Sequence, residues 1–307
     1  MNVFSRAVIV LFGFILPLAA HAQTKVRLGY TSVSSYMAAY VAKEQGIFAR
    51  NGLDVELQAV AGGALVPGLQ GGSLEMIGIP PTNVILAVIS GLDMVYVAGT
   101  AVTQKSDQDF GILIGKNSGI SSAKELEGKK VSVPSVGGFL HVMALKWLVN
   151  QGVDPKKVGF VEANFAQTPD MLSRGTIQGA VSAAPFLNRA VESGASTVLA
   201  YLAADLPAKT SGSYYTTTGK WAQANPAAVR AFRQSIMEAI AFVEKNPAQA
   251  KSDMAKYVKL PPEVLATLKM PNLDGSVTTE QVSFWVNTLY ELGLATSKPE
   301  VSRLIAK

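Results

Sequence analysis

Hydrophobic residues along this chain fall into short runs that end at glycine or proline, and stretches of helical period separate these runs. The run from Leu74 to Ile79 ends at Pro80-Pro81. Thr82 or Asn83 can cap the helix that the next apolar segment predicts. The pattern therefore predicts a buried strand that leads directly into a helix. Such a junction offers free backbone N–H groups and the positive end of a helix dipole to an anionic or polar ligand, although it can also be a plain connector.

The same alternation continues along the chain. It predicts strands at 25–31, 54–60, 94–99, 110–115 and 130–133, and helices from Tyr36 to Gln45, from Gly62 toward Leu69, from Thr82 to Ser90, at Ala123–Leu126 and over the segment that ends near Gly152. Beyond Ala222 the pattern is helical, with cap-and-proline starts at Asn225-Pro226 and Asn246-Pro247 and further starts at 260–265 and 278–281.

Two segments of the chain match each other. The sequence LQGGSLEMIGIPP from Leu69 resembles LSRGTIQGAVSAAP from Leu172, and Gly72 aligns with Gly175 at an offset of 103 residues. The segments that begin at Lys25 and Lys130, and at Gly52 and Gly152, match at similar offsets of 105 and 100. This spacing predicts two copies of a β-α-β-α-β unit, because a solenoid repeat would have a period of about 20 to 50 residues.

The two copies predict two lobes of an α/β protein. Lobe one is expected to comprise residues 23–105 and 210–307, with the C-terminal helices packed on it, and lobe two residues 106–209. The chain then crosses between the lobes twice, near Ala98 to Phe110 and near Leu206 to Tyr215. Two crossings predict a hinge.

The first 22 residues have the pattern of a secretory signal. Arg6 precedes an apolar stretch from Ala7 to Ala20, and Ala20-His21-Ala22 is a small-residue cleavage site before Gln23. The stretch is shorter than the ~20 residues of a membrane-spanning helix. We therefore expect residues 1–22 to be a signal peptide that is cleaved after Ala22.

Composition restricts the chemistry. The chain contains no cysteine, which excludes disulfides, thiolate metal sites and lipid attachment through an N-terminal cysteine. A free periplasmic protein is expected. The formal net charge is +5, but lysine and arginine are dispersed, so no nucleic-acid partner is expected.

Four segments carry a family resemblance. They are AAYVAKEQGIFARNGLDVELQAVAGG from Ala38 to Gly63, LQGGSLEMIGIPP, ISSAKELEGKKVSVPSVGG and SRGTIQGAVSAAPFLNRA. Together they resemble the nitrate/sulfonate/taurine-type solute-binding proteins of bacterial ABC importers, whose superfamily also includes a pyrimidine-precursor synthase. The resemblance implies a two-lobed periplasmic-binding-protein fold of type II. It also implies a monomer that holds a small organic anion between its lobes and delivers it to an ABC permease in the inner membrane.

The sequence departs from that family at two places. Glu75 and Gln178 replace an aspartate that the family commonly has in each lobe, and we expect both to be structural. Many members place a bulky aromatic residue and an acid where this chain has Ala183-Ala184. Because these two side chains are small, we expect a wider pocket at this place and a ligand larger than nitrate or taurine.

No catalytic constellation is recognised in the sequence. His141 is the only histidine after the signal segment, and neither a Gly-x-Ser-x-Gly nucleophile elbow nor a phosphate-binding glycine loop occurs. We therefore expect neither an enzyme, nor a cofactor, nor a transition-metal site. Two alternatives stay open: a ligand-sensing partner of a membrane receptor, and a periplasmic enzyme on the same fold.

The expected ligand contacts lie at strand ends and helix starts. They are Ser34, Ser35, Tyr36, Gly62, Gly63, Pro81, Thr82 and Asn83 in lobe one, and Ser135, Gly137, Gly138, Phe139, His141 and Ala183 in lobe two. Each residue also has a purely structural alternative. The serines could act simply as helix caps, the glycines as turn residues, and Phe139 and His141 as core residues. We expect Thr82 to offer a hydroxyl from lobe one, and Gly137-Gly138 to bring backbone N–H groups to the ligand from lobe two.

Overall fold

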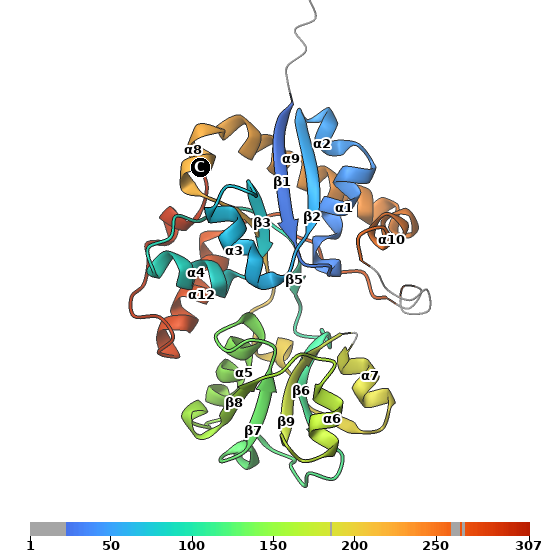
Figure 1. Cartoon of the computed structure of the whole chain (residues 1–307), viewed down its shortest axis with the longest axis vertical. Helices are drawn as coiled ribbons and strands as arrows, with labels where there is room; N and C mark the ends of the chain where they lie inside the picture. The colour runs from blue at the N-terminus through green and yellow to red at the C-terminus, as the bar shows by residue number, and fades with distance from the viewer. Residues whose placement is uncertain (1–22, 185, 259–264, 266–267) are drawn as a thin grey trace, which may run out of the picture.

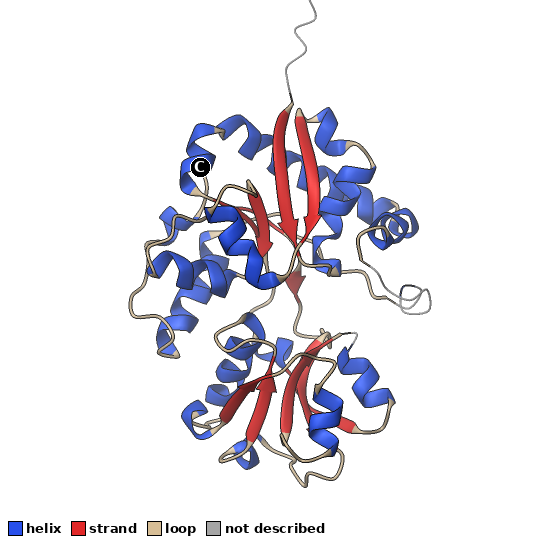
Figure 2. Cartoon of the chain, in the orientation of Figure 1, coloured by secondary structure: helices blue, strands red, loops and turns tan. Residues whose placement is uncertain are grey.

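The structure is a computed structural model that describes residues 23–184, 186–258, 265 and 268–307. It has two lobes, and each is built on a five-stranded sheet with helices on its faces (Figures 1 and 2). The expected α/β architecture is confirmed. The expected signal segment lies outside the described residues, as does the helix start expected at 260–265 apart from Leu265.

The sheet of lobe one has the strand order β2-β1-β3-β12-β4. Its elements are β1 (Thr24–Tyr30), η1 (Ser34–Tyr36), α1 (Met37–Glu44), α2 (Ile47–Arg50), β2 (Leu53–Ala59), α3 (Gly62–Gln70), β3 (Met76–Ile79), α4 (Pro81–Ile89), β4 (Val95–Gly99) and β12 (Tyr214–Thr217). Strands β1, β2 and β3 are parallel, and β12 runs antiparallel to β3 and β4.

The sheet of lobe two has the strand order β10-β6-β9-β7-β8. Its elements are β6 (Phe110–Gly115), η2 (Ala123–Leu126), β7 (Lys130–Val133), α5 (Phe139–Asn150), η3 (Pro155–Lys157), β8 (Gly159–Glu162), α6 (Thr168–Ser173), β9 (Gly179–Ala183), α7 (Phe186–Glu192), β10 (Ser196–Tyr201) and η4 (Leu202–Asp205). Strands β7, β8 and β9 are parallel, and β6 runs antiparallel to β9.

The two sheets are copies of one arrangement. In lobe one Leu28 lies opposite Met76, and in lobe two Val131 lies opposite Gly179, so equivalent pairs are 103 residues apart. Each sheet also has two strands beyond the three of the predicted unit. The fourth strand, β12 in lobe one and β6 in lobe two, runs antiparallel to the first three, and the fifth strand is β4 or β10. Strand β10 was missed by the sequence analysis because it is mostly half-buried and has no clear alternation.

A two-stranded antiparallel ribbon lies where the chain passes between the lobes. Strand β5 (Val102–Thr103) pairs with β11 (Thr210–Ser211), and the Thr103 hydroxyl donates to the carbonyl of Thr210. The ribbon lies within the two stretches where crossings were expected. The lobe boundaries at 105/106 and 209/210 stay a prediction.

The C-terminal helices pack on lobe one, as expected. They are α8 (Gly219–Ala224), α9 (Pro226–Lys245), α10 (Pro247–Ala255), α12 (Thr279–Glu291) and η5 (Val301–Leu304). Helix α9 lies against α1 and α12 against α4. Helix α9 also holds the C-terminal segment in place, because the Arg233 guanidinium donates to the carbonyls of Val97 and Ala306. None of the described helices combines the length and apolar character that crossing a membrane requires.

Helix α5 connects the two lobes on one side of the molecule. It packs against α4, and Phe139 at its start lies against Trp285 of α12 with ring centroids 5.4 Å apart. Further along α5, Lys146 forms an ion pair with Glu291 at 3.4 Å. A single apolar cluster therefore continues from one lobe into the other, with Val84 and Val142 among its members.

Candidate functional site between the lobes

The candidate site is the region where the carboxyl ends of the parallel strands in the two lobes face each other. Strands β1 and β2 run toward lobe two, and β7 and β9 run toward lobe one (Figure 1). Carboxyl ends of parallel strands are where open α/β sheets bind ligands. The sequence-predicted residues lie at or just after these strand ends in both lobes, and they differ in how far they are exposed.

In lobe one, the exposed candidates follow three neighbouring strands. Ser34 and Ser35 lie partly exposed in η1 after β1, and Gly62 and Gly63 are exposed at the start of α3 after β2. Asn83 is exposed in the first turn of α4. An α-helix leaves its first N–H groups without intrahelical partners, so α3 and α4 both present donors here.

Tyr36 differs from its neighbours because its side chain is buried. Its ring packs against Tyr215 and so close to β3 that a Cβ at Gly78 would lie 2.4 Å from it. Burial raises the pKa of the Tyr36 hydroxyl, and interactions with Ser213 and Thr31 oppose this shift. The ring thus fixes the loop after β1 against the sheet.

Thr82 is fully buried in the first turn of α4. Its hydroxyl has no hydrogen-bond partner among the described residues. The preceding Pro81 is also buried, and its carbonyl accepts from the Tyr96 hydroxyl at 3.0 Å. An unpaired buried hydroxyl is unfavourable by about 1 to 3 kcal/mol. Thr82 is therefore a group that would gain from a ligand or from water.

The loop after β7 corrects one expectation. We expected the N–H groups of Gly137 and Gly138 to be available to a ligand, but both already donate within the protein. The N–H of Gly137 donates to His141 Nδ1 at 2.9 Å, and that of Gly138 to the carbonyl of Ser135 at 3.1 Å. The N–H of Val136 donates to the Glu162 carboxylate at 2.8 Å. These N–H groups are all paired within lobe two, which leaves the exposed Ser135 side chain as the accessible polar group of this loop.

The two glycines have different structural roles. Gly137 has φ +78°, which only glycine adopts without strain. Gly138 has an ordinary φ of −72°, but a Cβ there would lie 3.1 Å from the carbonyl oxygen of Ser135. Replacing either residue would therefore disturb the turn itself, and loss of binding in such a variant would not identify a ligand contact.

Phe139 and Ala183 differ in accessibility. Phe139 is only partly exposed because it packs against Phe110 and Trp285 and lies beside Gly212 of the second interlobe crossing. Ala183 ends β9 and is partly exposed. The wider pocket expected beside it stays a prediction.

His141 is buried in the first turn of α5, with 5% of its surface exposed. Its ring lies edge-on to Phe160, with centroids 4.5 Å apart. Because Nδ1 accepts from Gly137, the neutral ring carries its proton on Nε2, which has no partner among the described residues. Burial lowers the pKa of His141 from 6.5 to about 4, so the ring is neutral at pH 7.

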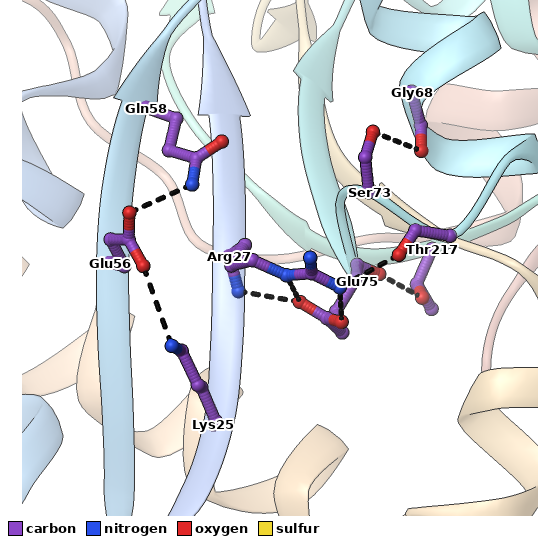
Figure 3. Close-up of polar contacts among 9 residues, drawn as sticks. Lys25, Arg27, Glu56, Gln58, Gly68, Ser73, Glu75 and Thr217 are labelled. Carbon is purple, nitrogen blue, oxygen red and sulfur yellow. Dashed lines mark hydrogen bonds and ion pairs between the residues drawn. The ribbon is translucent and has the colours of Figure 1, made fainter.

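Glu75 and Gln178 lie at the opposite ends of the sheets, away from the candidate site, and have structural roles there. The Glu75 carboxylate pairs with the Arg27 guanidinium and accepts from the Arg27 backbone N–H at 2.8 Å (Figure 3). Gln178 repeats this contact in lobe two, where its Oε1 accepts from the N–H of Lys130 at 3.0 Å. Both residues therefore join neighbouring parallel strands, as expected of structural positions.

Two hollows lie away from the facing strand ends. The larger, about 470 Å³, opens beside Glu75 and Trp221 at the far end of lobe one, and the other lies near Asn272 and the β5–β11 ribbon. Neither hollow is lined by the candidate ligand contacts at the strand ends. Across the described ranges, no group of three or more histidine or acidic side chains is placed to hold a metal ion.

Sequence reasoning missed three apolar residues of this interlobe face. Val136, Phe165 and Phe186 follow the ends of β7, β8 and β9. The repeat offset of 103 aligns them with Val33, Gly62 and Asn83. That alignment was the available signal, because two of those three lobe-one residues, Gly62 and Asn83, had already been selected.

The burial of His141 predicts a pH-dependent stability. The unfolded chain binds the proton more readily than the folded protein between pH 6.5 and about 4, so this contribution is fully present above pH 6.5 and is lost as the pH falls to about 4. The loss should reach about 3 kcal/mol at most. Urea unfolding at pH 7.5 and pH 4.5 should show a smaller stability difference in His141→Asn than in the parent. Equal differences in both proteins would contradict the buried neutral ring.

Known proteins resemble this chain over most of its length. A putative aliphatic sulfonates-binding protein of Escherichia coli is 24% identical over 254 residues, which are 80% of this chain and 76% of that protein. A putative thiamine biosynthesis protein of Haemophilus influenzae is 27% identical over 169 residues, or 55% of this chain. The chain spans about half (52%) of the Haemophilus protein's length.

Solved structures show the same fold. The periplasmic aliphatic sulphonate binding protein SsuA from Escherichia coli superposes with a TM-score of 0.77 at 23% identity, over 92% of this chain and 97% of that one. The desulfurization enzyme DSZB has a TM-score of 0.68 at 12% identity, over 92% of this chain and 96% of that one. The two-lobed fold is thus that of periplasmic binding proteins. The model of the family described as NMT1/THI5 like matches residues 34–250, which is more than half of the sequence, and the chain belongs to that family.

Proposed function

We propose that this protein is an extracytoplasmic solute-binding protein that captures a small organic anion between its lobes and delivers it to an ABC import permease. One observation carries the proposal. Two sheets of the same topology face each other by their carboxyl ends, and the helices α3, α4 and α5 begin at that face. The names of the sulfonate-binding relatives support the same conclusion.

Lobe one supplies the polar contacts in this proposal. The starts of α3 and α4 direct free N–H groups and the positive helix end toward the face, and Ser34 and Ser35 add hydroxyls. This arrangement holds an anion without a charged side chain. Movement about the β5–β11 ribbon would then bring lobe two over the bound solute.

A periplasmic enzyme is the second candidate, because the desulfurization enzyme DSZB shares the fold. An enzyme of this kind would need a general base to transfer protons. His141 fits that role poorly, since the lone pair of its Nδ1 already accepts from Gly137, its Nε2 carries the proton and its ring is buried. We therefore favour binding without turnover. A sensing role would be separated from transport by capture of a receptor ectodomain in place of a permease.

The central prediction is reversible binding without conversion. Thermal unfolding should be followed with sulfonates, aromatic carboxylates and pyrimidines, and a true ligand should raise the midpoint with the logarithm of its excess over Kd. The bound compound should be recovered unchanged by mass spectrometry after overnight incubation. Recovery of a product would replace the transport proposal with the enzyme.

Thr82→Val tests whether the buried hydroxyl meets the ligand. Valine keeps the side-chain shape and removes an unpaired donor, so the ligand-free protein should be at least as stable as the parent. Affinity should fall by about 0.5 to 1.5 kcal/mol, measured by calorimetry.

The matched control for this test is Thr216→Val. The Thr216 hydroxyl is also buried and without a partner in the described structure, but it lies in β12 opposite Ile77, within the sheet. This control should leave affinity unchanged. If Thr82→Val binds as tightly as the control, the hydroxyl does not contact ligand.

Export is a separate prediction. The pattern before Gln23 should be cleaved, so that protein recovered from the periplasmic fraction begins at Gln23 and remains soluble without detergent. N-terminal sequencing and fractionation measure both. An intact Met1, or retention in the membrane fraction, would rule out a cleaved signal.

A further inference from the structure

Lobe two presents exposed apolar side chains at the ends of its parallel strands. Val136, after β7, is 51% exposed, and Phe186, after β9, is 38% exposed. Single exposed apolar residues are common, but a group at one sheet edge marks a surface that becomes covered. This edge is the one that faces lobe one.

Phe165 and Phe186 form a stacked pair at this edge. Their ring centroids lie 5.3 Å apart with an interplanar angle of 26°. Phe165 follows β8 and Phe186 begins α7, so the contact joins loops that follow two different strands. The pair is a preformed planar apolar surface, and Phe186 keeps more than a third of its area accessible.

The internal repeat shows how the two lobes differ at equivalent positions. With the offset of 103 residues, Phe165 corresponds to Gly62, and Phe186 corresponds to Asn83. Lobe one therefore has backbone donors and an amide where lobe two has two aromatic rings. The lobes differ at these two positions, whereas Val136 corresponds to Val33, which is also apolar and is 44% exposed.

We propose that Phe165, Phe186 and Val136 form an aryl subsite, and that the ligand is an aromatic monoanion whose acid group lies on lobe one and whose ring lies on lobe two. The inference rests on the proposed binding function. It narrows the substrate class from small organic anions to arenesulfonates or arenecarboxylates.

The Glu162 carboxylate on lobe two favours a ligand with a single acid group. The Glu162 carboxylate accepts from the backbone N–H of Val136, in the loop that follows β7. This carboxylate opposes a second negative group on the lobe-two edge. An inorganic anion would leave the apolar face unused, whereas a ring gains both burial and stacking.

The test compares ligands of equal carbon number on the full-length mature protein. Benzenesulfonate should bind up to about tenfold more tightly than hexanesulfonate, and nitrate should bind more weakly than both. Phe186→Ala should remove most of the preference for benzenesulfonate and change hexanesulfonate binding less than threefold. Phe186→Leu should keep hexanesulfonate binding while losing the aromatic preference. Met237→Ala, an exposed residue on α9, is the control for general surface effects.

The outcomes separate this inference from the proposed function. If hexanesulfonate or nitrate binds as tightly as benzenesulfonate, or if Phe186→Ala weakens all ligands equally with an unchanged melting midpoint, the aryl subsite is wrong while solute binding stands. If an amphoteric pyrimidine alone binds, the ligand is not an aromatic monoanion. If no compound in the panel binds the parent protein, the binding function and the subsite both fail.

Discussion

The antiparallel ribbon between β5 and β11 is the constraint on which the rest of the structure depends. It pairs two segments more than 100 residues apart, Val102–Thr103 and Thr210–Ser211, so both interlobe crossings lie side by side. Each sheet receives its antiparallel fourth strand from one crossing: β6 follows β5, and β12 follows β11. The parallel strands of both lobes then run toward the crossings. As a result, strand ends and helix starts that are distant in sequence meet at one face.

The duplicated sheets show how much of this arrangement follows from local sequence. The Glu75 and Gln178 side chains bond to the backbone of Arg27 and Lys130, and each of these contacts fixes a parallel strand pair in the same register. Their similarity was visible as the repeat, so two equivalent lobes could be predicted. The strand-to-helix junction at Pro81 was also predictable, because turn and cap residues act over a few positions.

The side-chain environment within the site could not be predicted in the same way. Tyr36 is buried by Gly78 and Tyr215, and His141 by Phe160, and these partners are distant in sequence. The loop at Val136 uses a carboxylate 26 residues away, which turns an expected donor site into a closed turn. Such contacts depend on tertiary packing, which local patterns do not contain. Phe186 was predictable in principle, since the repeat aligns it with Asn83.

The contact between α5 and α12 gives the two sides of the interlobe region different properties. On the α5 side, Phe139 packs on Trp285 and Lys146 pairs with Glu291, so the lobes are already joined there. Helices α6 and α7 pack on the other face of the lobe-two sheet, and the Phe165–Phe186 pair lies at the strand ends on that side. A rotation about the ribbon that keeps the α5 contact moves this other side most, because it is farther from the fixed packing. In the proposed closure the aromatic pair would therefore lie where solvent exposure changes most, while Tyr36 and His141 hold the loops beneath the face in place.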